Sequence, residues 1–275
     1  MRDRIQVIDF WSGNRSSVRR DYERDVLTAA LHATRQEYGA WKLVERMDDY
    51  PGNMESSAFR KYGHDLFVTT AGNRKMSKED KTVIYHPILN NLLGYRVIII
   101  REEDQDHFAQ IDSSDALKRF KVGIPELWTD ADLLRHNGFT VIEKGGFDEL
   151  FANLRNGEFA FTTLGINEVD GVFAEREDEL ANVTTVGHLL IHYPLPLLFY
   201  VNPDEPELAA RIARGMRIIS ADRTMDRLFA DHNKGVMEKI GLSRRKIIRL
   251  ENPMLPKEIA DLQTDPVTAD ETSHR

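Results

Sequence analysis

The stretch KVGIPELWTDADLLRHNGFTVIEKGGFDELFANLRNGEFAFTT, residues 121–163, decides the fold class. We expect strands at 121–124, 140–143 and 159–163, with a helix at 129–136 between the first two. A second helix is indicated by an apolar stripe at i, i+3, i+4 and i+7, formed by Phe147, Leu150, Phe151 and Leu154. Strands and helices that alternate at this short spacing are typical of an α/β unit with a parallel sheet.

The flanking segments extend this α/β prediction in both directions. Before the stretch we expect strands at 5–10, 41–47, 65–70, 81–88 and 95–100, and a helix at 17–36. The charged segment 102–106 is expected to cross between two units. After the stretch we expect one strand over 189–201 interrupted by prolines, then a helix from 204 to Gly215, and two short helices at 224–230 and 234–240. The polar end, 264–275, is expected to be disordered.

Composition excludes several classes of function. The 275 residues include no cysteine, so disulfides, thiolate metal sites, cysteine nucleophiles and a lipidated cysteine are excluded. The formal net charge of -8 argues against general nucleic-acid binding. The most apolar run, 189–201, is broken by His192, Pro194 and Pro196, so no stretch is expected to span a membrane. The first residues form no apolar secretory segment, which leaves a cytosolic protein or one whose leader has been removed.

No common catalytic or cofactor motif is present: the sequence has no Gly-x-Gly-x-x-Gly, no P-loop, no Gly-x-Ser-x-Gly and no His-Glu-x-x-His. His188 and His192 have a spacing that suits a metal on a helix, but their segment has the pattern of a strand. The carboxylates of Asp48 and Asp49 lie on a turn and are expected to be solvated. We therefore expect no metal and no cofactor.

Three loops carry candidate binding residues because each follows the carboxyl end of an expected strand, where open α/β sheets bind ligands. The loop at 11–13 offers Trp11 as an aromatic platform, with core packing as the alternative. The loop at 69–74 offers the hydroxyls of Thr69 and Thr70 and the cation of Arg74, with a solvated basic turn as the alternative. The loop at 126–130 offers Trp128 and, at a helix start that favours anions, Thr129; the alternatives are core packing and a plain helix cap.

Five segments in order resemble a known family. They are LGYRVIII at 93–100, WTDADLLRHNGF at 128–139, FDELFANLRNGEF at 147–159, GINEV at 165–169, and YPLP at 193–196 followed by FYV at 199–201. Together they are similar to a divergent branch of family 3, the amino-acid-type extracellular solute-binding proteins. The resemblance covers about residues 90–230 and is weak over 1–65.

The resemblance implies a type 2 periplasmic-binding-protein fold, an α/β architecture of two lobes joined by two crossing strands. Lobe 1 would comprise 1–101 and the return 197–275, and lobe 2 would comprise 102–196. The implied function is non-catalytic binding of a small polar solute between the lobes, as the periplasmic component of an ABC-type uptake system made with a signal peptide. The protein would be a monomer whose partner is a membrane permease or a sensor receptor. The implied ligand-binding residues are Trp11, Thr69, Thr70, Arg74, Trp128, Thr129, Thr162 and Thr163.

Two departures from the family pattern bear on the ligand. The arginine that clamps a carboxylate is represented only by Arg74, which is shifted, and the acid that pairs an amino group is replaced around 162–164. Both argue against a zwitterionic α-amino acid and leave open a different small polar molecule or a loss of binding. Two alternatives stay open: a ligand-sensing module that docks a membrane receptor, and a lyase on the same fold in which Glu126 or Glu168 acts as acid or base.

Overall fold

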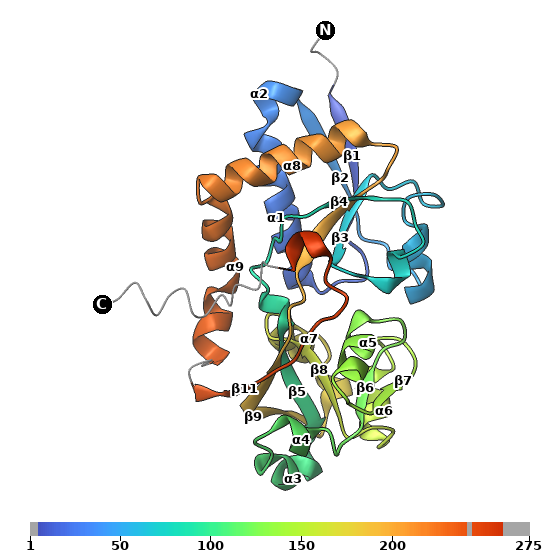
Figure 1. Ribbon diagram of the computed structural model, residues 1–275, viewed down its shortest axis with the longest axis vertical. Coiled ribbons are helices and arrows are strands. Elements are labelled where there is room, and N and C mark those ends of the chain that lie inside the picture. The colour runs from blue at the N-terminus through green and yellow to red at the C-terminus, as the bar shows by residue number, and fades with distance from the viewer. Residues whose placement is uncertain (1–4, 241–243, 261–275) are drawn as a thin grey trace, which may run out of the picture. The chain divides into compact units, whose positions relative to one another are not determined.

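A computed structural model describes residues 5–240 and 244–260 (Figure 1). Within these residues the chain forms two compact units. Unit 1 comprises 5–71, 75–89 and 197–235, and unit 2 comprises 72–74, 90–196 and the described part of 236–260. The mixed α/β class expected from the sequence is confirmed by two sheets with helices between their strands.

Unit 1 is built on a five-stranded sheet in the order β2-β1-β3-β10-β4. β1 (Gln6–Trp11) pairs in parallel with β2 (Trp41–Arg46) and with β3 (Leu66–Thr70). β10 (Leu197–Val201) runs antiparallel between β3 and β4 (Thr82–Ile84). β1 and β3 therefore end at the same edge of the sheet, which places the loops after them next to each other.

The helices of unit 1 differ from expectation in where they begin and end. They are α1 (Ser17–Ala33), α2 (Arg35–Tyr38), α8 (Pro206–Ala221) and α9 (Thr224–Ile240), the last of which continues into residues of unit 2. The predicted end of α8 at Gly215 is wrong, because Gly215 lies inside the helix, where a Cβ would stand 2.3 Å from the Ala30 carbonyl oxygen of α1. The two short helices predicted at 224–230 and 234–240 are one continuous helix, because the Asp, His and Asn residues at 231–233 between them disfavour a helix only weakly.

Unit 2 is built on a six-stranded sheet in the order β11-β9-β5-β8-β6-β7. β6 pairs in parallel with β7 and β8, β11 pairs in parallel with β9, and β5 runs antiparallel to β8 and β9. The predicted helix at 129–136 is confirmed as α5, and β11 was missed by the sequence prediction. The strands are β5 (Tyr95–Arg101), β6 (Val122–Ile124), β7 (Val141–Glu143), β8 (Phe161–Gly165), β9 (Val183–His192) and β11 (Lys246–Arg249); the helices are α3 (Gln105–Ala109), α4 (Ser114–Leu117), α5 (Thr129–His136), α6 (Leu150–Arg155) and α7 (Val169–Glu175).

The division of the chain differs from the predicted lobes 1–101, 102–196 and 197–275. Segment 102–106 makes no crossing; it is a 3-10 turn (Glu102–Asp104) that leads into α3. The change of unit falls between 89 and 90, because β5 pairs with unit-2 strands on both sides. The strand predicted over 189–201 is two strands of different sheets, β9 and β10, separated by 193–196. The predicted disordered end, 264–275, lies outside the described residues.

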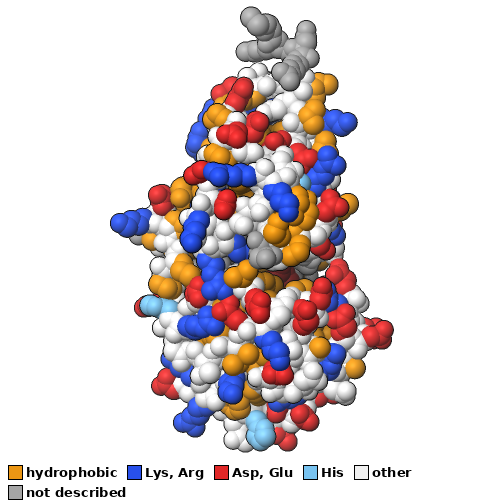
Figure 2. Space-filling model, turned by 90° about the vertical axis from the view of Figure 1, so that its right-hand side faces the viewer, with side chains coloured by type: hydrophobic (Ala, Val, Ile, Leu, Met, Phe, Trp, Pro, Cys, Tyr) orange, Lys and Arg blue, Asp and Glu red, His pale blue; other side chains and the backbone are white. Residues whose placement is uncertain are grey.

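The surface carries charges of both signs. Figure 2 shows basic and acidic side chains interspersed on the face in view. Among the described residues, the search for a helix long and apolar enough to cross a membrane finds none.

Candidate functional site

Unit 1 brings three of the predicted site residues to one edge of its sheet. Trp11 is the last residue of β1 and pairs in register with Phe67 of β3, and Thr69 and Thr70 end β3. The carboxyl ends of these parallel strands are where ligands bind in open α/β sheets. The remaining candidates, Arg74, Trp128, Thr129, Thr162 and Thr163, belong to unit 2.

Trp11 is fully buried and serves as a support. Its indole Nε1 donates a hydrogen bond to the carbonyl of Asp48 at 2.9 Å. A Cβ on Gly13 would stand 2.0 Å from the same carbonyl oxygen, so only glycine fits there. The guanidinium of Arg15 lies over the indole, 5.0 Å from the ring centroid. One face of the aromatic platform is therefore already occupied by a cation of the chain.

Arg15 is a further candidate residue at this edge, and it is not among those predicted from the sequence. It begins a spacing of Arg15, Arg19 and Glu23 at four-residue intervals, which is the signal that could have found it. Its Nε lies 3.1 Å from Glu23, and Glu23 also pairs with Arg19 at 2.7 Å. Its two terminal nitrogens donate to the carbonyls of Gly13 and Val68. Burial lowers the pKa of Arg15, against the opposing effect of Glu23.

Thr69 lies in a second charged group of the same edge. Its hydroxyl donates to Glu55 at 3.3 Å, and the ammonium of Lys75 donates to the other oxygen of Glu55 at 2.7 Å. Burial raises the pKa of Glu55, but Lys75 and Arg15 outweigh this effect, and the pKa of Glu55 lies below its ordinary value. Thr70 is half-buried, and its carbonyl accepts a hydrogen bond from the Tyr200 hydroxyl at 3.3 Å.

The two charged groups bring cations and carboxylates together at this edge. Three cations, Arg15, Arg19 and Lys75, face the carboxylates of Glu23 and Glu55, and the charge of Asp49 also acts on Arg15. Burial disfavours the charged form of Arg15, and a nearby negative charge favours it. The guanidinium of Arg15 is therefore stabilised by negative charge beside it.

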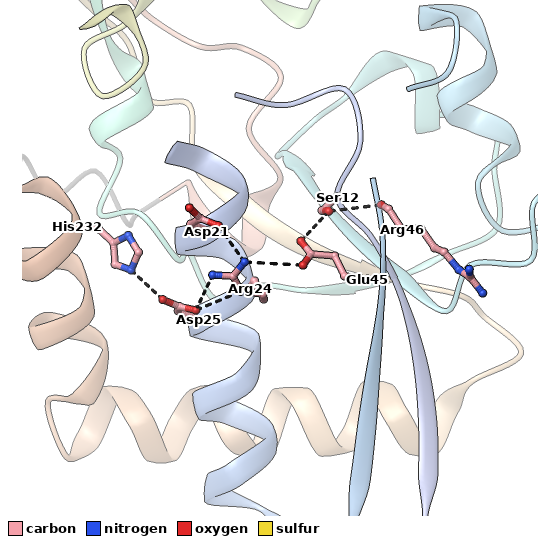
Figure 3. A network of polar contacts seen from close by, with 7 residues as sticks. All are labelled: Ser12, Asp21, Arg24, Asp25, Glu45, Arg46 and His232. Atoms are coloured by element: carbon pink, nitrogen blue, oxygen red, sulfur yellow. Dashed lines mark hydrogen bonds and ion pairs between the residues drawn. The ribbon is translucent and has the colours of Figure 1, made fainter. Parts of the chain in front are cut away.

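Ser12 has a structural role in the same loop. Its hydroxyl donates to Glu45 of β2 at 2.8 Å, and Glu45 lies 3.8 Å from Arg24 of α1 (Figure 3). Arg24 pairs in turn with Asp21 and Asp25, and Asp25 lies 3.0 Å from His232 of α9. This network fixes the start of the loop that follows Trp11.

In unit 2, the side chain of Arg74 is held by carboxylates of the chain itself. Its Nη1 donates to both oxygens of Asp132, at 3.0 and 2.9 Å, and its Nη2 donates to Glu143. Arg135 joins the group at 2.6 Å from Glu143. Arg74 thus makes the forked contact with carboxylate for which arginine is suited, with protein groups as the partners.

The aromatic and hydroxyl residues at the start of α5 are packed against unit 2. Trp128 is half-buried and stacks on Phe147, with ring centroids 5.9 Å apart and planes at 18°. Trp128 occupies the N-terminal cap position of α5, so the alternative that Thr129 caps the helix is wrong. Thr129 is the first residue of the helix and is buried.

Thr162 and Thr163 lie buried in β8. The Thr162 hydroxyl donates to the carbonyl of Gly123 in β6 at 2.7 Å, which joins the two strands. The backbone carbonyl of Thr163 accepts from Arg96 at 3.4 Å. Arg96 in turn lies 2.9 Å from Asp130, whose carboxylate also accepts a hydrogen bond from the Tyr193 hydroxyl.

The two glutamates of the lyase alternative lie in different surroundings. Glu126 is exposed, on the turn before α5, and its carboxylate accepts from the backbone of Gly145 at 3.4 Å. Glu168 is half-buried at the cap position of α7 and interacts with Arg96. A search of the described residues finds no group of three or more metal-ligating side chains.

Comparison with solved structures identifies the fold. A histidine kinase sensor domain with similarity to periplasmic binding proteins matches with a TM-score of 0.58 at 14% identity, covering 84% of this chain and 97% of that one. The probable amino-acid ABC transporter extracellular-binding protein ytmK of Bacillus subtilis matches with a TM-score of 0.58 at 15% identity, covering 83% and 97%. An arginine-specific periplasmic binding protein of Salmonella typhimurium matches with a TM-score of 0.55 at 13% identity, covering 82% and 98%.

At the level of sequence, no protein-family model and no curated protein matches the chain. The structural matches nevertheless extend over more than four-fifths of it. The chain therefore has the fold of amino-acid-binding periplasmic proteins, as the resemblance in the sequence implied.

Proposed function

We propose that the protein binds, without catalysis, a small polar solute that carries an anionic group. The observation that carries this proposal is the pair of largely buried cations, Arg15 and Lys75, at the carboxyl edge of the unit-1 sheet. There Arg15 lies over the Trp11 ring, and Lys75 shares the carboxylate of Glu55 with the Thr69 hydroxyl.

The edge is preorganised for such a group. Arg15 is fixed by Glu23, by two backbone carbonyls and by the Trp11 ring, so little side-chain entropy is lost when a solute binds. Thr69 and Lys75 already donate to one carboxylate, that of Glu55, which is the chemistry that a solute carboxylate would meet. In unit 2 the predicted contacts are Arg74, Trp128, Thr129, Thr162 and Thr163. Placement of the solute between the two units stays a prediction from the sequence.

The comparisons support a transport role in the periplasm. Two of the matched proteins are described as an ABC transporter extracellular-binding protein and an arginine-specific periplasmic binding protein. We propose the same role here, with a membrane permease as partner. A sensor role is the second candidate, because another matched structure is the sensor domain of a histidine kinase. The genes beside this one distinguish the two: permease genes support transport, and a receptor kinase gene supports sensing.

A thermal-shift screen tests the proposal. Amino acids, small organic acids and polyamines are added singly to the purified protein, and we expect at least one anionic compound to raise the Tm. Thr69→Val, which keeps the side-chain shape and removes the hydroxyl, should reduce that shift. Thr82→Val, the same exchange on the half-buried edge strand β4, is the matched control and should leave it unchanged. If only polyamines stabilise the protein, the anionic class is wrong, and if no compound does, solute binding is wrong.

A further inference from the structure

The carboxylate of Glu143 lies in a nest of donors in unit 2. Its Oε1 accepts from the guanidinium of Arg74 and from the backbone N–H of Leu127, the latter at 3.2 Å. Its Oε2 lies 2.6 Å from Arg135. Two guanidinium groups and a backbone amide that converge on one carboxylate form the donor set that proteins use to bind an anion.

The backbone of Leu127 is bent to complete this nest. Its φ is +67°, in the left-handed region that bulky side chains rarely adopt, and its apolar side chain is 36% exposed. A left-handed backbone is strained at a leucine. Strain of this kind is maintained where the surrounding structure needs it, and here it directs an amide N–H at the Glu143 carboxylate.

The charges of this group also balance only because Glu143 is present. Arg74 and Arg135 carry two positive charges, and Asp132 and Glu143 carry two negative ones. Burial raises the pKa of Glu143, but its hydrogen bonds to Arg135 and Leu127 and the charge of Arg74 outweigh this and leave the pKa below its ordinary value. Glu143 therefore keeps its charge to lower pH than an ordinary glutamate does.

We propose that Arg74, Arg135 and the Leu127 amide form an anion site that Glu143 occupies from within, so that a second carboxylate of a solute, distinct from the anionic group proposed for the unit-1 edge, enters it by displacing Glu143. The inference rests on the proposed function for its ligand, an anionic solute, and adds how one of the predicted contacts, Arg74, is regulated. An internal competitor lowers the apparent affinity for the solute, because the solute can enter only during the fraction of time in which Glu143 is out of the site. The site therefore takes carboxylates that bring further contacts of their own and excludes simple anions.

Chemical rescue tests this site independently of the natural solute. Glu143→Ala vacates the nest, and we expect a lower Tm that acetate or formate restores at concentrations at which chloride does not. Glu158→Ala is the matched control, because Glu158 is also ion-paired in unit 2, to Lys144 at 2.8 Å, but with one cation only. Its Tm should not respond to acetate. In the double variant Arg74→Met, Glu143→Ala the rescue should disappear.

A second measurement uses the milder variant Glu143→Gln, which keeps the shape of the side chain. Fluorotryptophan NMR follows the resonance of Trp128, next to Leu127, assigned by its loss in Trp128→Phe. We expect sulfate to shift this resonance in Glu143→Gln at a concentration about tenfold or more below that needed in the wild type. Equal sulfate responses in the two proteins, or acetate rescue that persists without Arg74, would overturn the inference. The solute screen described above is unaffected by either result, so the two proposals fail separately.

Discussion

The guanidinium of Arg15 lies 5.0 Å from the centroid of the Trp11 ring, in an environment where both side chains are almost completely buried. The tryptophan that the sequence offers as a platform for a solute thus holds a cation of the chain. A solute at this edge meets the charge of Arg15, and Trp11 acts by fixing where that charge lies.

Glu23 should be essential for stability because it is the buried counter-ion of Arg15. Glu23→Gln leaves Arg15 in a site with insufficient negative charge, and we expect a loss of about 3 kcal/mol in the free energy of unfolding. Asp21→Asn on the same helix removes a half-exposed partner of Arg24 and should cost less than about 1 kcal/mol. Urea unfolding of both variants measures the difference, and equal losses would contradict the role assigned to Glu23.

Gly72 should tolerate alanine less well than Gly63, although both have a left-handed backbone. Their φ angles are +74° and +71°, so each Gly→Ala exchange carries a strain of about 1 kcal/mol. A Cβ at Gly72 would also stand 2.4 Å from the Met254 carbonyl oxygen, whereas nothing lies within 4 Å of one at Gly63. We expect Gly72→Ala to lose a further 1–3 kcal/mol or so by overpacking, measured by thermal unfolding. Equal Tm values would show that the segment around Met254 yields freely.

Stability should fall as the pH is lowered from about 6.5 to 4 because of His192. Burial, with a smaller contribution from Arg249, lowers its pKa to about 4, so the unfolded chain binds a proton in this range that the folded chain does not. The stabilisation is complete above the unfolded pKa and is lost as the pH falls through the folded one; it amounts to about 3 kcal/mol. Urea unfolding at pH 7.5 and 4 measures it. His192→Gln should flatten the slope, and an unchanged slope would assign it to other groups.

Leu127 should be replaceable by a residue that accepts the left-handed conformation. Leu127→Asn is expected to raise the Tm relative to Leu127→Ala, because asparagine enters this region at lower cost while both exchanges remove the same exposed apolar surface. Differential scanning calorimetry compares the two. If alanine is the more stable variant, the turn does not have the strain that its φ indicates.

Much of the fold could be predicted from local pattern. The stretch 121–163 produced α5 with its bounds and strands β6, β7 and β8 in the expected order, because apolar periodicity and the Asn137-Gly138 stop are local signals. β11 was missed because its four residues become a strand only by pairing with β9, which is far away in sequence. The sequence predicts the change of unit at 102–106, after β5, whereas the structure has it before β5. The reason is that strand propensity does not tell which sheet a strand joins.

The site could be predicted in part for a similar reason. Strand ends locate Trp11, Thr69 and Thr70 at one edge, since topology alone brings the carboxyl ends of parallel strands together. Charge pairing is not readable in the same way. Glu55, Lys75 and Glu143 look like surface residues in the sequence, and only the folded chain shows that each completes a largely buried ion pair.

The most direct measurement of the central claim is a crystal structure of the protein with the best stabilising solute from the screen. The account predicts that the anionic group of the solute lies within about 3 Å of the Thr69 hydroxyl or the Lys75 ammonium and faces Arg15. A solute bound elsewhere, or one that presents a cation to this edge of unit 1, would contradict it.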